Sequence, residues 1–246
     1  MMDFTGKNVL VTGGSRGIGR AIAQGFAERG ARVALSYLTN RQAADETIAA
    51  LPGGPHLAIQ ADVSDPESAR RLIDEAAQSL GRLDILVNNA GMWLEHLVEE
   101  VDFDGWQDAW RRTLDTNLVG PANLAYLAAR HMIEHGGGRI VNVSSRGAFR
   151  GEPRAPAYGA SKAGLNARWA AIGARLTLHR TQGKRLVRTL RAGEGFLSQS
   201  SKRQIAETGS QGSQCRSPRD RAGPGFQVWQ SHSGLLARCA SVNQCF

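Results

Sequence analysis

Acidic residues are scarce in the last third of the sequence. Residues 168–246 contain 3 Asp and Glu against 13 Lys and Arg, a net charge of +10, whereas residues 1–167 contain 19 against 17, a net charge of −2. The overall charge of +8 therefore belongs entirely to the last third. A basic surface for nucleic acid or an anionic membrane is thus not indicated for the first two thirds of the chain.

Cysteine and long apolar runs are scarce as well. The three cysteines, Cys215, Cys239 and Cys245, are odd in number, lie in the last third and lack metal-ligand spacing. This pattern argues against a disulfide framework and against a metal site. No apolar run approaches the roughly 18 residues of a membrane span, and Asp3 followed by a glycine turn replaces the apolar segment of a signal peptide. We therefore expect a cytoplasmic protein with no membrane contact.

What the first 167 residues do contain is an alternation of short apolar runs with helical patterns. This alternation is typical of βαβ units and a parallel sheet covered on both faces. The predicted strands are Val9–Thr12, Val33–Tyr37, Leu57–Gln60, Ile85–Asn88 and Ile140–Val143. The sequence thus predicts one α/β domain with a Rossmann-like, doubly wound parallel sheet over residues 1–167.

Three helical patterns separate these strands. The first has an apolar stripe from Ile18 to Phe26, and the second begins with Ser64 and Glu67 spaced as a capping box. The third is one long pattern that runs from Trp106 to Leu124 and places Asn117 on its apolar side. A buried amide at this position needs hydrogen-bond partners. The alternative is that Asn117 is a structural residue that bends the helix.

Two motifs in this framework point to chemistry. The segment TGGSRGIG at residues 12–19 joins the first strand to the first helix, where backbone N–H groups can bind a nucleotide pyrophosphate. Tyr158 and Lys162 are four residues apart on one helix face. A tyrosine of pKa about 10 is a poor proton donor at neutral pH, and a neighbouring ammonium group favours its phenolate.

The set of motifs resembles the classical short-chain dehydrogenase/reductase family over about residues 5–167. The resemblance rests on TGGSRGIG, Asp62–Val63, NNAG at residues 88–91, Asn117, Ser145, Tyr158 and Lys162, each at the expected place in the βα order. Within this family, the sequence is most similar in style to 3-oxoacyl-acyl-carrier-protein reductases. The resemblance implies reduction of a carbonyl group, or oxidation of a secondary alcohol, with a nicotinamide cofactor.

The resemblance also implies roles for individual residues. Tyr158 would protonate the carbonyl oxygen, Ser145 would hydrogen-bond that oxygen, Lys162 would lower the tyrosine pKa and bind the nicotinamide ribose, and Asn117 would hold a water that relays protons to the lysine. The phosphates would be bound by Gly13, Ser15, Arg16, Gly17, Ile18 and Gly19. Asp62 and Val63 would contact the adenine, while Asn89, Ala90 and Gly91 would border the adenosine ribose and steady the centre of the sheet.

Charge at the end of the second strand bears on the choice of cofactor. An acid there would bind a ribose 2′-hydroxyl and repel a 2′-phosphate. The segment ALSYLTNR has no acid, and Arg16 and Arg41 can reach a phosphate, so we predict NADP(H). The alternative is that Arg41 merely caps the next helix and Arg16 is a solvated loop residue. Similarly, Arg146, Arg150 and Arg154 fit a carrier-linked substrate or are solvated loop arginines.

The last third does not follow the family pattern. No sixth strand with a Pro-Gly turn and no seventh strand with an Asn-Gly-Gly turn can be recognised, so we expect residues 168–246 to be atypical or disordered. Without them, the fifth strand becomes an exposed apolar edge, and the surface of the homo-oligomer typical of the family is missing. Residues 168–177, RWAAIGARLT, can still wind as helix.

A shifted reading frame is one hypothesis for this change. Family members often end the catalytic helix with Leu-Ala-Pro-His-Gly, and codons for that segment, read one base later, yield the Leu-His-Arg-Thr found at residues 178–181. An alternative function remains open, namely a non-catalytic nucleotide-binding protein whose basic tail binds nucleic acid. The tail scatters its arginines among Ser and Gln without interleaved aromatics, which makes nucleic acid the less favoured partner.

Overall fold

The computed structural model describes residues 2–176 and 187–190. Its strands are β1 (Asn8–Val11), β2 (Arg32–Tyr37), β3 (Leu57–Gln60), β4 (Ile85–Asn88), β5 (Arg139–Val143) and β6 (Val187–Leu190). They form one parallel sheet in the order β3-β2-β1-β4-β5-β6. The predicted doubly wound fold is thereby confirmed, with strand bounds within one residue of the prediction for β1 to β5.

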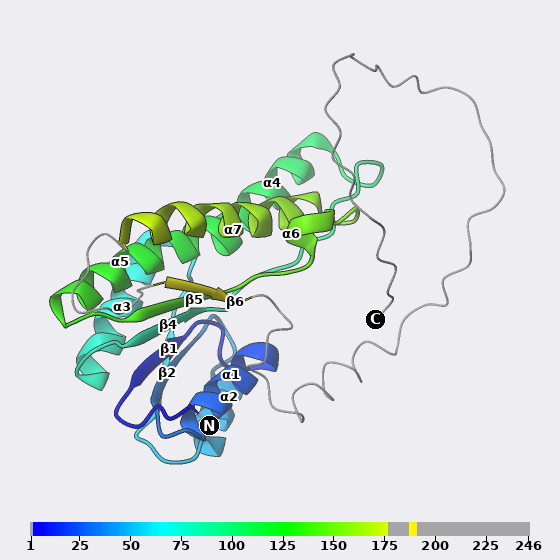
Figure 1. Cartoon of the computed structure of the whole chain (residues 1–246). Helices are drawn as coiled ribbons and strands as arrows, with labels where there is room; N and C mark the ends of the chain where they lie inside the picture. Colours follow the sequence, from blue (N-terminus) through cyan, green and yellow to red (C-terminus); the bar gives the residue numbers. More distant parts are fainter. Residues whose placement is uncertain (1, 177–186, 191–246) are drawn as a thin grey trace, which may run out of the picture.

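Helices cover both faces of the sheet (Figure 1). They are α1 (Gly17–Ala27), α2 (Arg41–Ala50), α3 (Pro66–Leu80), α4 (Phe103–Leu114), the π-helical turn η1 (Asp115–Val119), α5 (Gly120–Glu134), α6 (Gly147–Arg150) and α7 (Pro156–Leu176). Val9 and Val11 of β1 pack with α1 on one face, whereas Leu10 packs with α3 and α5 on the other. Since both faces of β1 are covered, its sequence does not alternate between apolar and polar residues.

The sixth strand corrects an expectation drawn from the sequence. β6 pairs in parallel with β5 from Ile140↔Val187 to Val143↔Leu190, so β5 is not an exposed edge. β6 has only four residues, among them the β-branched Val187 and Thr189, and its pairing with β5 supplies the hydrogen bonds that a strand needs. The composition of so short a segment does not reveal such a partner. The remaining predictions for the last third fall on residues 177–186 and 191–246, outside the described part.

The helix boundaries bring three further corrections. Asp65, not Ser64, caps α3 through its carboxylate and the Ser68 N–H, because Pro66 keeps Asp65 extended. Ile18 is 51% exposed, since Gly19, Ala23, Phe26 and Ala27 form the buried side of α1.

The predicted long third helix is two helices joined by η1. In contrast, α7 does continue to Leu176, past the predicted domain boundary at residue 167.

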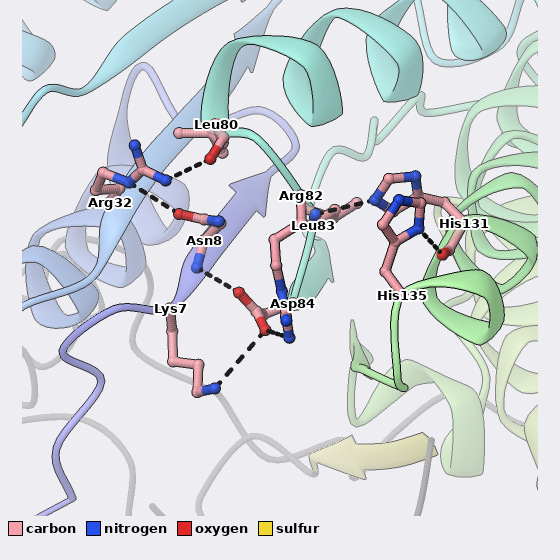
Figure 2. Close-up of polar contacts among 9 residues, drawn as sticks. All are labelled: Lys7, Asn8, Arg32, Leu80, Arg82, Leu83, Asp84, His131 and His135. Atoms are coloured by element: carbon pink, nitrogen blue, oxygen red, sulfur yellow. Dashed lines mark hydrogen bonds and ion pairs between the residues drawn. The ribbon is translucent and has the colours of Figure 1, made fainter. Parts of the chain in front are cut away.

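The amino ends of the strands are joined by a polar cluster (Figure 2). The buried carboxylate of Asp84 accepts a hydrogen bond from the Asn8 N–H at 3.0 Å and forms ion pairs with Lys7 and Arg82. Nearby, Nε2 of His131 accepts the Leu83 N–H at 3.1 Å and its ring stacks on His135 with centroids 4.0 Å apart. The opposite, carboxyl ends carry the motifs that predicted function.

Candidate active site

The glycine-rich segment is held by the strands on either side of it. Asn89, just after β4, donates through Nδ2 to the carbonyl oxygens of Thr12 at 2.9 Å and Gly13 at 3.1 Å. In return, the Thr12 hydroxyl accepts the N–H groups of Asn89 and Ala90, both at 3.0 Å. These bonds join the start of the glycine-rich segment to the residues after β4.

Gly19 lies where this arrangement leaves no room for a side chain. A Cβ on Gly19 would stand 2.1 Å from the Gly13 carbonyl oxygen and 2.6 Å from Nδ2 of Asn89. On the outer side of the loop, Gly17 has a φ of +54° and nothing within 4 Å of its Cβ position. The loop is thus closely packed on its inner side and open on its outer side.

The N-terminus of α1 differs from those of α2, α3 and α4. Side chains of Asn40, Asp65 and Asp102 cap the latter three helices, whereas Arg16 at the N-cap of α1 makes no side-chain cap bond and the first turn has no acid. Uncapped N–H groups beside an open glycine loop suit an anion. These residues fit the pyrophosphate of a dinucleotide.

The other predicted nucleotide contacts lie along the same edge of the sheet. Ser15 is buried, and its carbonyl oxygen accepts hydrogen bonds from Arg20 and from the Thr47 hydroxyl. Asp62 is exposed after β3, with Oδ1 accepting the N–H and hydroxyl of Ser64. Val63 is buried against Gly120. Their adenine and phosphate contacts stay predictions.

Arg41 is engaged within the protein. It is the first residue of α2, and its Nε lies 3.0 Å from Oδ2 of Asp45, one turn further on. The hydrogen bond and charge of Asp45 raise the pKa of Arg41. Arg16 is exposed at the start of α1. A 2′-phosphate at the end of β2 would therefore compete with Asp45 for the Arg41 guanidinium.

Lys162 is the buried cation of the site. Its side chain is 5% exposed, and Nζ donates a hydrogen bond to the Val143 carbonyl oxygen at 3.1 Å. The same atom lies 5.7 Å from the centroid of the Tyr158 ring. Burial lowers the pKa of Lys162 from 10.5 to about 8. The predicted tyrosine and lysine thus lie together at the carboxyl end of β5.

Asn117 is fully buried in the π-helical turn. Its Oδ1 accepts the Met92 N–H at 2.8 Å, and its Nδ2 donates to the Met92 carbonyl oxygen at 2.9 Å and to the Ser161 hydroxyl at 3.3 Å. These hydrogen bonds explain why an amide is buried here, because they connect the segment after β4 to η1 and α7. The water relay stays a prediction.

Gly91, which has no side chain, leaves room for both Asn117 and Lys162 beside it. A Cβ on Gly91 would stand 3.1 Å from Oδ1 of Asn117 and 3.6 Å from Nζ of Lys162. Asn117 and Lys162 therefore converge on the same backbone position. The structure brings together three predicted residues that are far apart in the sequence.

Ser145 follows β5 by two residues. Its hydroxyl is half-buried and accepts the Gly147 N–H at 3.1 Å. Since the Val143 carbonyl of the same strand end binds Lys162, Ser145 and Lys162 share this corner of the sheet. Next to it, the buried Ser144 hydroxyl has no hydrogen-bond partner among the described residues.

Two residues near Tyr158 were missed by the sequence analysis. The Trp93 ring lies 4.8 Å from the Tyr158 ring, centroid to centroid, and His96 binds the first turn of α7. Neither Trp93 nor His96 is part of a recognisable sequence motif, so no signal in the sequence points to them. Of the three arginines considered for a carrier-linked substrate, Arg154 pairs with Glu95, whereas Arg146 and Arg150 are exposed.

The described residues contain neither a metal-binding cluster nor a membrane-spanning helix. Residues 2–176 and 187–190 contain no group of three His, Cys, Asp or Glu side chains arranged to hold a metal ion. Over the same ranges, no helix is long and apolar enough to cross a membrane.

Comparisons with curated proteins find oxidoreductases. An uncharacterized oxidoreductase of Methylorubrum extorquens is 39% identical over 169 residues, which is 68% of this chain and 66% of that protein. A 3-oxoacyl-[acyl-carrier-protein] reductase of Staphylococcus aureus is 38% identical over 161 residues, which is 65% of this chain and 64% of the reductase. The chain thus spans slightly less than two thirds of the length of these relatives.

Solved structures show the same relationship. A short-chain dehydrogenase of Burkholderia cenocepacia in complex with NADP is 36% identical, with a TM-score of 0.66, covering 76% of this chain and 72% of that one. A short-chain dehydrogenase/reductase of Serratia marcescens is 33% identical, with a TM-score of 0.67, covering 77% and 74%.

Family models add the extent of the match. A model described as ASPIC and UnbV matches residues 164–212, most of which lie outside the described part. The model described as short chain dehydrogenase matches residues 7–181, which is 14 residues beyond the predicted boundary. It spans the glycine-rich loop, Asn117, Ser145, Tyr158 and Lys162. The chain belongs to the short-chain dehydrogenase family.

Proposed function

We propose that this protein is an NADPH-dependent reductase that converts the carbonyl group of a 3-oxoacyl thioester into a secondary alcohol. The observation that carries this proposal is the position of Lys162, a buried cation 5.7 Å from the centre of the Tyr158 ring. When bound, the reduced nicotinamide supplies the hydrogen and the electron pair that reduce the carbonyl carbon.

Three residues of the chain complete the reaction. The Tyr158 hydroxyl donates its proton to the carbonyl oxygen, where negative charge develops. The Lys162 ammonium stabilises the phenolate that remains, since an opposite charge within a few ångströms favours the charged form. The Ser145 hydroxyl donates a hydrogen bond to the same oxygen and so orients the carbonyl group. Asn117 holds the segment around Met92 and Gly91 in place beside this site.

Turnover by the full chain tests the proposal. Purified protein should oxidise NADPH in the presence of acetoacetyl thioester, and Tyr158→Phe should abolish this activity because it removes the transferred proton. Tyr126→Phe is the matched control, since Tyr126 is 63% exposed on α5. Absence of turnover in the wild type with any carbonyl compound, or normal turnover in Tyr158→Phe, would contradict the proposed reaction.

The choice of NADPH over NADH is supported by charge at the end of β2. Residues 36–40 contain no acid, and Arg41 begins the next helix. The Burkholderia relative has NADP bound. Arg41→Gln should weaken NADPH binding about tenfold and leave NADH binding unchanged, since losing about 1.4 kcal/mol of charge pairing corresponds to that factor. Arg111→Gln, another arginine in an exposed ion pair, is the control.

Asp45→Asn gives the complementary measurement. It releases Arg41 from its carboxylate partner, so NADPH should bind more tightly. Equal effects of Arg41→Gln on the two cofactors would argue for NADH instead.

The thioester class is supported by the staphylococcal relative and by two arginines beside Ser145. Arg146 and Arg150 are exposed on and next to α6, where they can meet the phosphate of a carrier's prosthetic arm. The expected partner is therefore an acyl carrier protein, and we infer a cytoplasmic location, where NADPH is available. A simple ketone that is reduced better than the thioester would point to a small-molecule substrate.

A further inference from the structure

The segment after β4 holds the start of the catalytic helix through one buried histidine. His96 is 1% exposed, and its Nε2 accepts the Ala157 N–H at 3.2 Å. Its Nδ1 lies 2.9 Å from the Leu94 carbonyl oxygen, which can only accept. Nδ1 must therefore carry the proton and Nε2 the free electron pair, so the two bonds select one neutral form of the ring.

The hydrogen bond from the Ala157 N–H to His96 pairs the one N–H group in the first turn of α7 that has no acceptor within the helix or the residues just before it. Pro156 has no N–H, and the N–H groups of Tyr158 and Gly159 bind the Ala155 carbonyl oxygen. The Ala157 N–H points to His96, 61 residues earlier in the sequence. Because Ala157 directly precedes Tyr158, this contact fixes the backbone from which the tyrosine projects.

His96 is itself anchored on three sides. Its own N–H donates to the Arg154 carbonyl oxygen at 3.0 Å, and the adjacent Glu95 forms an ion pair with the Arg154 side chain. Its ring packs edge-on against Trp106 of α4, with centroids 5.4 Å apart. The histidine is therefore a rigid link between α4 and the start of α7.

The same segment also touches the tyrosine ring. Asn117 fixes Met92 at one end of the segment, His96 fixes the other end, and Trp93 between them lies against Tyr158. Backbone and ring of Tyr158 are thus both positioned by residues 92–96. General acid catalysis depends on such placement, since a shift of about 1 Å can cost a hundredfold in rate.

We propose that His96 is a positioning residue for Tyr158, acting through the Ala157 N–H and through the segment that carries Trp93. The proposal rests on the proposed function, because it assigns Tyr158 the role of proton donor. It predicts that the hydrogen-bond acceptor at Nε2, and not only the bulk of the ring, is needed for the proton-transfer step.

The test compares three variants of the full chain. His96→Ala removes the acceptor, His96→Gln returns an amide oxygen that can accept the Ala157 N–H, and His56→Ala is the matched control. His56 also accepts a backbone N–H, from Val33 at 3.1 Å, and contacts the Pro52 carbonyl oxygen at 3.0 Å, but it lies beside β2 and β3. It thus measures the cost of losing a similar pair of bonds elsewhere.

We expect kcat to fall roughly tenfold to a hundredfold in His96→Ala. The KM for NADPH should stay unchanged, and His96→Gln should recover most of kcat. His56→Ala should lower the melting temperature without changing kcat. Normal kcat in His96→Ala, or equal losses of kcat in His96→Ala and His56→Ala, would overturn the proposal.

A second measurement needs no turnover. Hydrogen exchange of the Ala157 amide should be faster in His96→Ala than in the wild type, and His96→Gln should restore slow exchange. If the wild type reduces no carbonyl compound, the proposed function fails while exchange still decides the role of His96. Unchanged exchange in His96→Ala would show that Nε2 does not hold the helix.

Discussion

Lys162 combines burial with positive charge, two properties that oppose one another. Burial makes the ammonium group costly and lowers its pKa to about 8, and one hydrogen bond to the Val143 carbonyl oxygen offsets only part of that cost. Such a cost persists where the charge serves a task, and here the charge lies beside the Tyr158 ring. Burial of Lys162 therefore lowers the stability of the fold while placing a charge beside Tyr158.

The cost of this residue should appear as a pH dependence of stability. Between the folded pKa of about 8 and the unfolded value of 10.5, the unfolded chain binds more protons. The free energy of unfolding should therefore rise as the pH increases through this range. Lys162→Met removes the titration, so it should be more stable than the wild type at pH 7, by up to about 3 kcal/mol.

Urea unfolding of both proteins at pH 7 and pH 10 checks this. The advantage of Lys162→Met should shrink at the higher pH. A difference that is the same at both pH values would show that the ammonium group is not destabilised by burial.

At the residue scale, spacing identified the groups that define the family but not those that position them. Tyr158 and Lys162 are four residues apart on one helix, so their proximity follows from helix geometry alone. Trp93 and His96 reach Tyr158 and Ala157 from a different element, across 65 and 61 residues. Their contacts depend on the path of the segment after β4, which no local pattern encodes.

Among the elements, α1 has a helix start that suits an anionic ligand. It lacks the side-chain cap that α2, α3 and α4 have, and the loop before it is packed against Asn89. The stability that a cap would contribute, about 1 kcal/mol, is forgone. The exposed Ile18, which the apolar stripe predicted to be buried, belongs to this open first turn.

Two glycines of α1 should respond in opposite ways to alanine. Gly19→Ala places a Cβ 2.1 Å from the Gly13 carbonyl oxygen, so the loop must move and NADPH binding should be lost. Gly25→Ala meets only the Arg29 side chain at 3.6 Å, so it should raise stability by roughly 0.5–1 kcal/mol and leave binding intact. Fluorescence titration with NADPH and thermal unfolding measure the two effects. Tight NADPH binding by Gly19→Ala would refute the assignment of the loop.

The π-helical turn explains why one predicted helix became two. Apolar periodicity runs on through residues 106–124, so it indicated a continuous helix. The Gly120 N–H bonds to the Asp115 carbonyl oxygen, five residues earlier, while Asn117 binds Met92. The buried side nevertheless continues through the turn, from Ala109 and Thr113 to Asn117, Pro121 and Ala125.

For the whole molecule, the positions of five strands and the doubly wound class were predictable, and the extent of the sheet was not. Apolar runs and glycine turns located β1 to β5, because the runs are short, rich in Val, Ile and Leu, and separated by helical patterns. β6 was missed, since its four residues follow a segment of scattered charge. The hypothesis of a shifted reading frame stays a prediction, although α7 and β6 both continue the fold beyond residue 167.

Pairing of β6 with β5 predicts slow hydrogen exchange in the last third of the chain. A peptide covering Val187–Leu190 should exchange as slowly as one covering Arg139–Val143, because parallel pairing engages the backbone of both strands. Mass spectrometry of the full chain after brief labelling measures this. Exchange of the β6 peptide at the rate of the unfolded chain would show that β6 does not pair with β5 and that β5 is the edge strand.

The Asp84 cluster has a consequence for altering this protein. It joins β1 and β4 at their amino ends, whereas Tyr158, Lys162 and the glycine-rich loop lie at the carboxyl ends. Substitutions in this cluster should therefore change the stability of the β1–β4 pair without touching the residues of the candidate active site. A protein engineer can thus alter the contacts of Lys7 and Arg82 with Asp84 separately from the segment around Trp93, which lies against Tyr158.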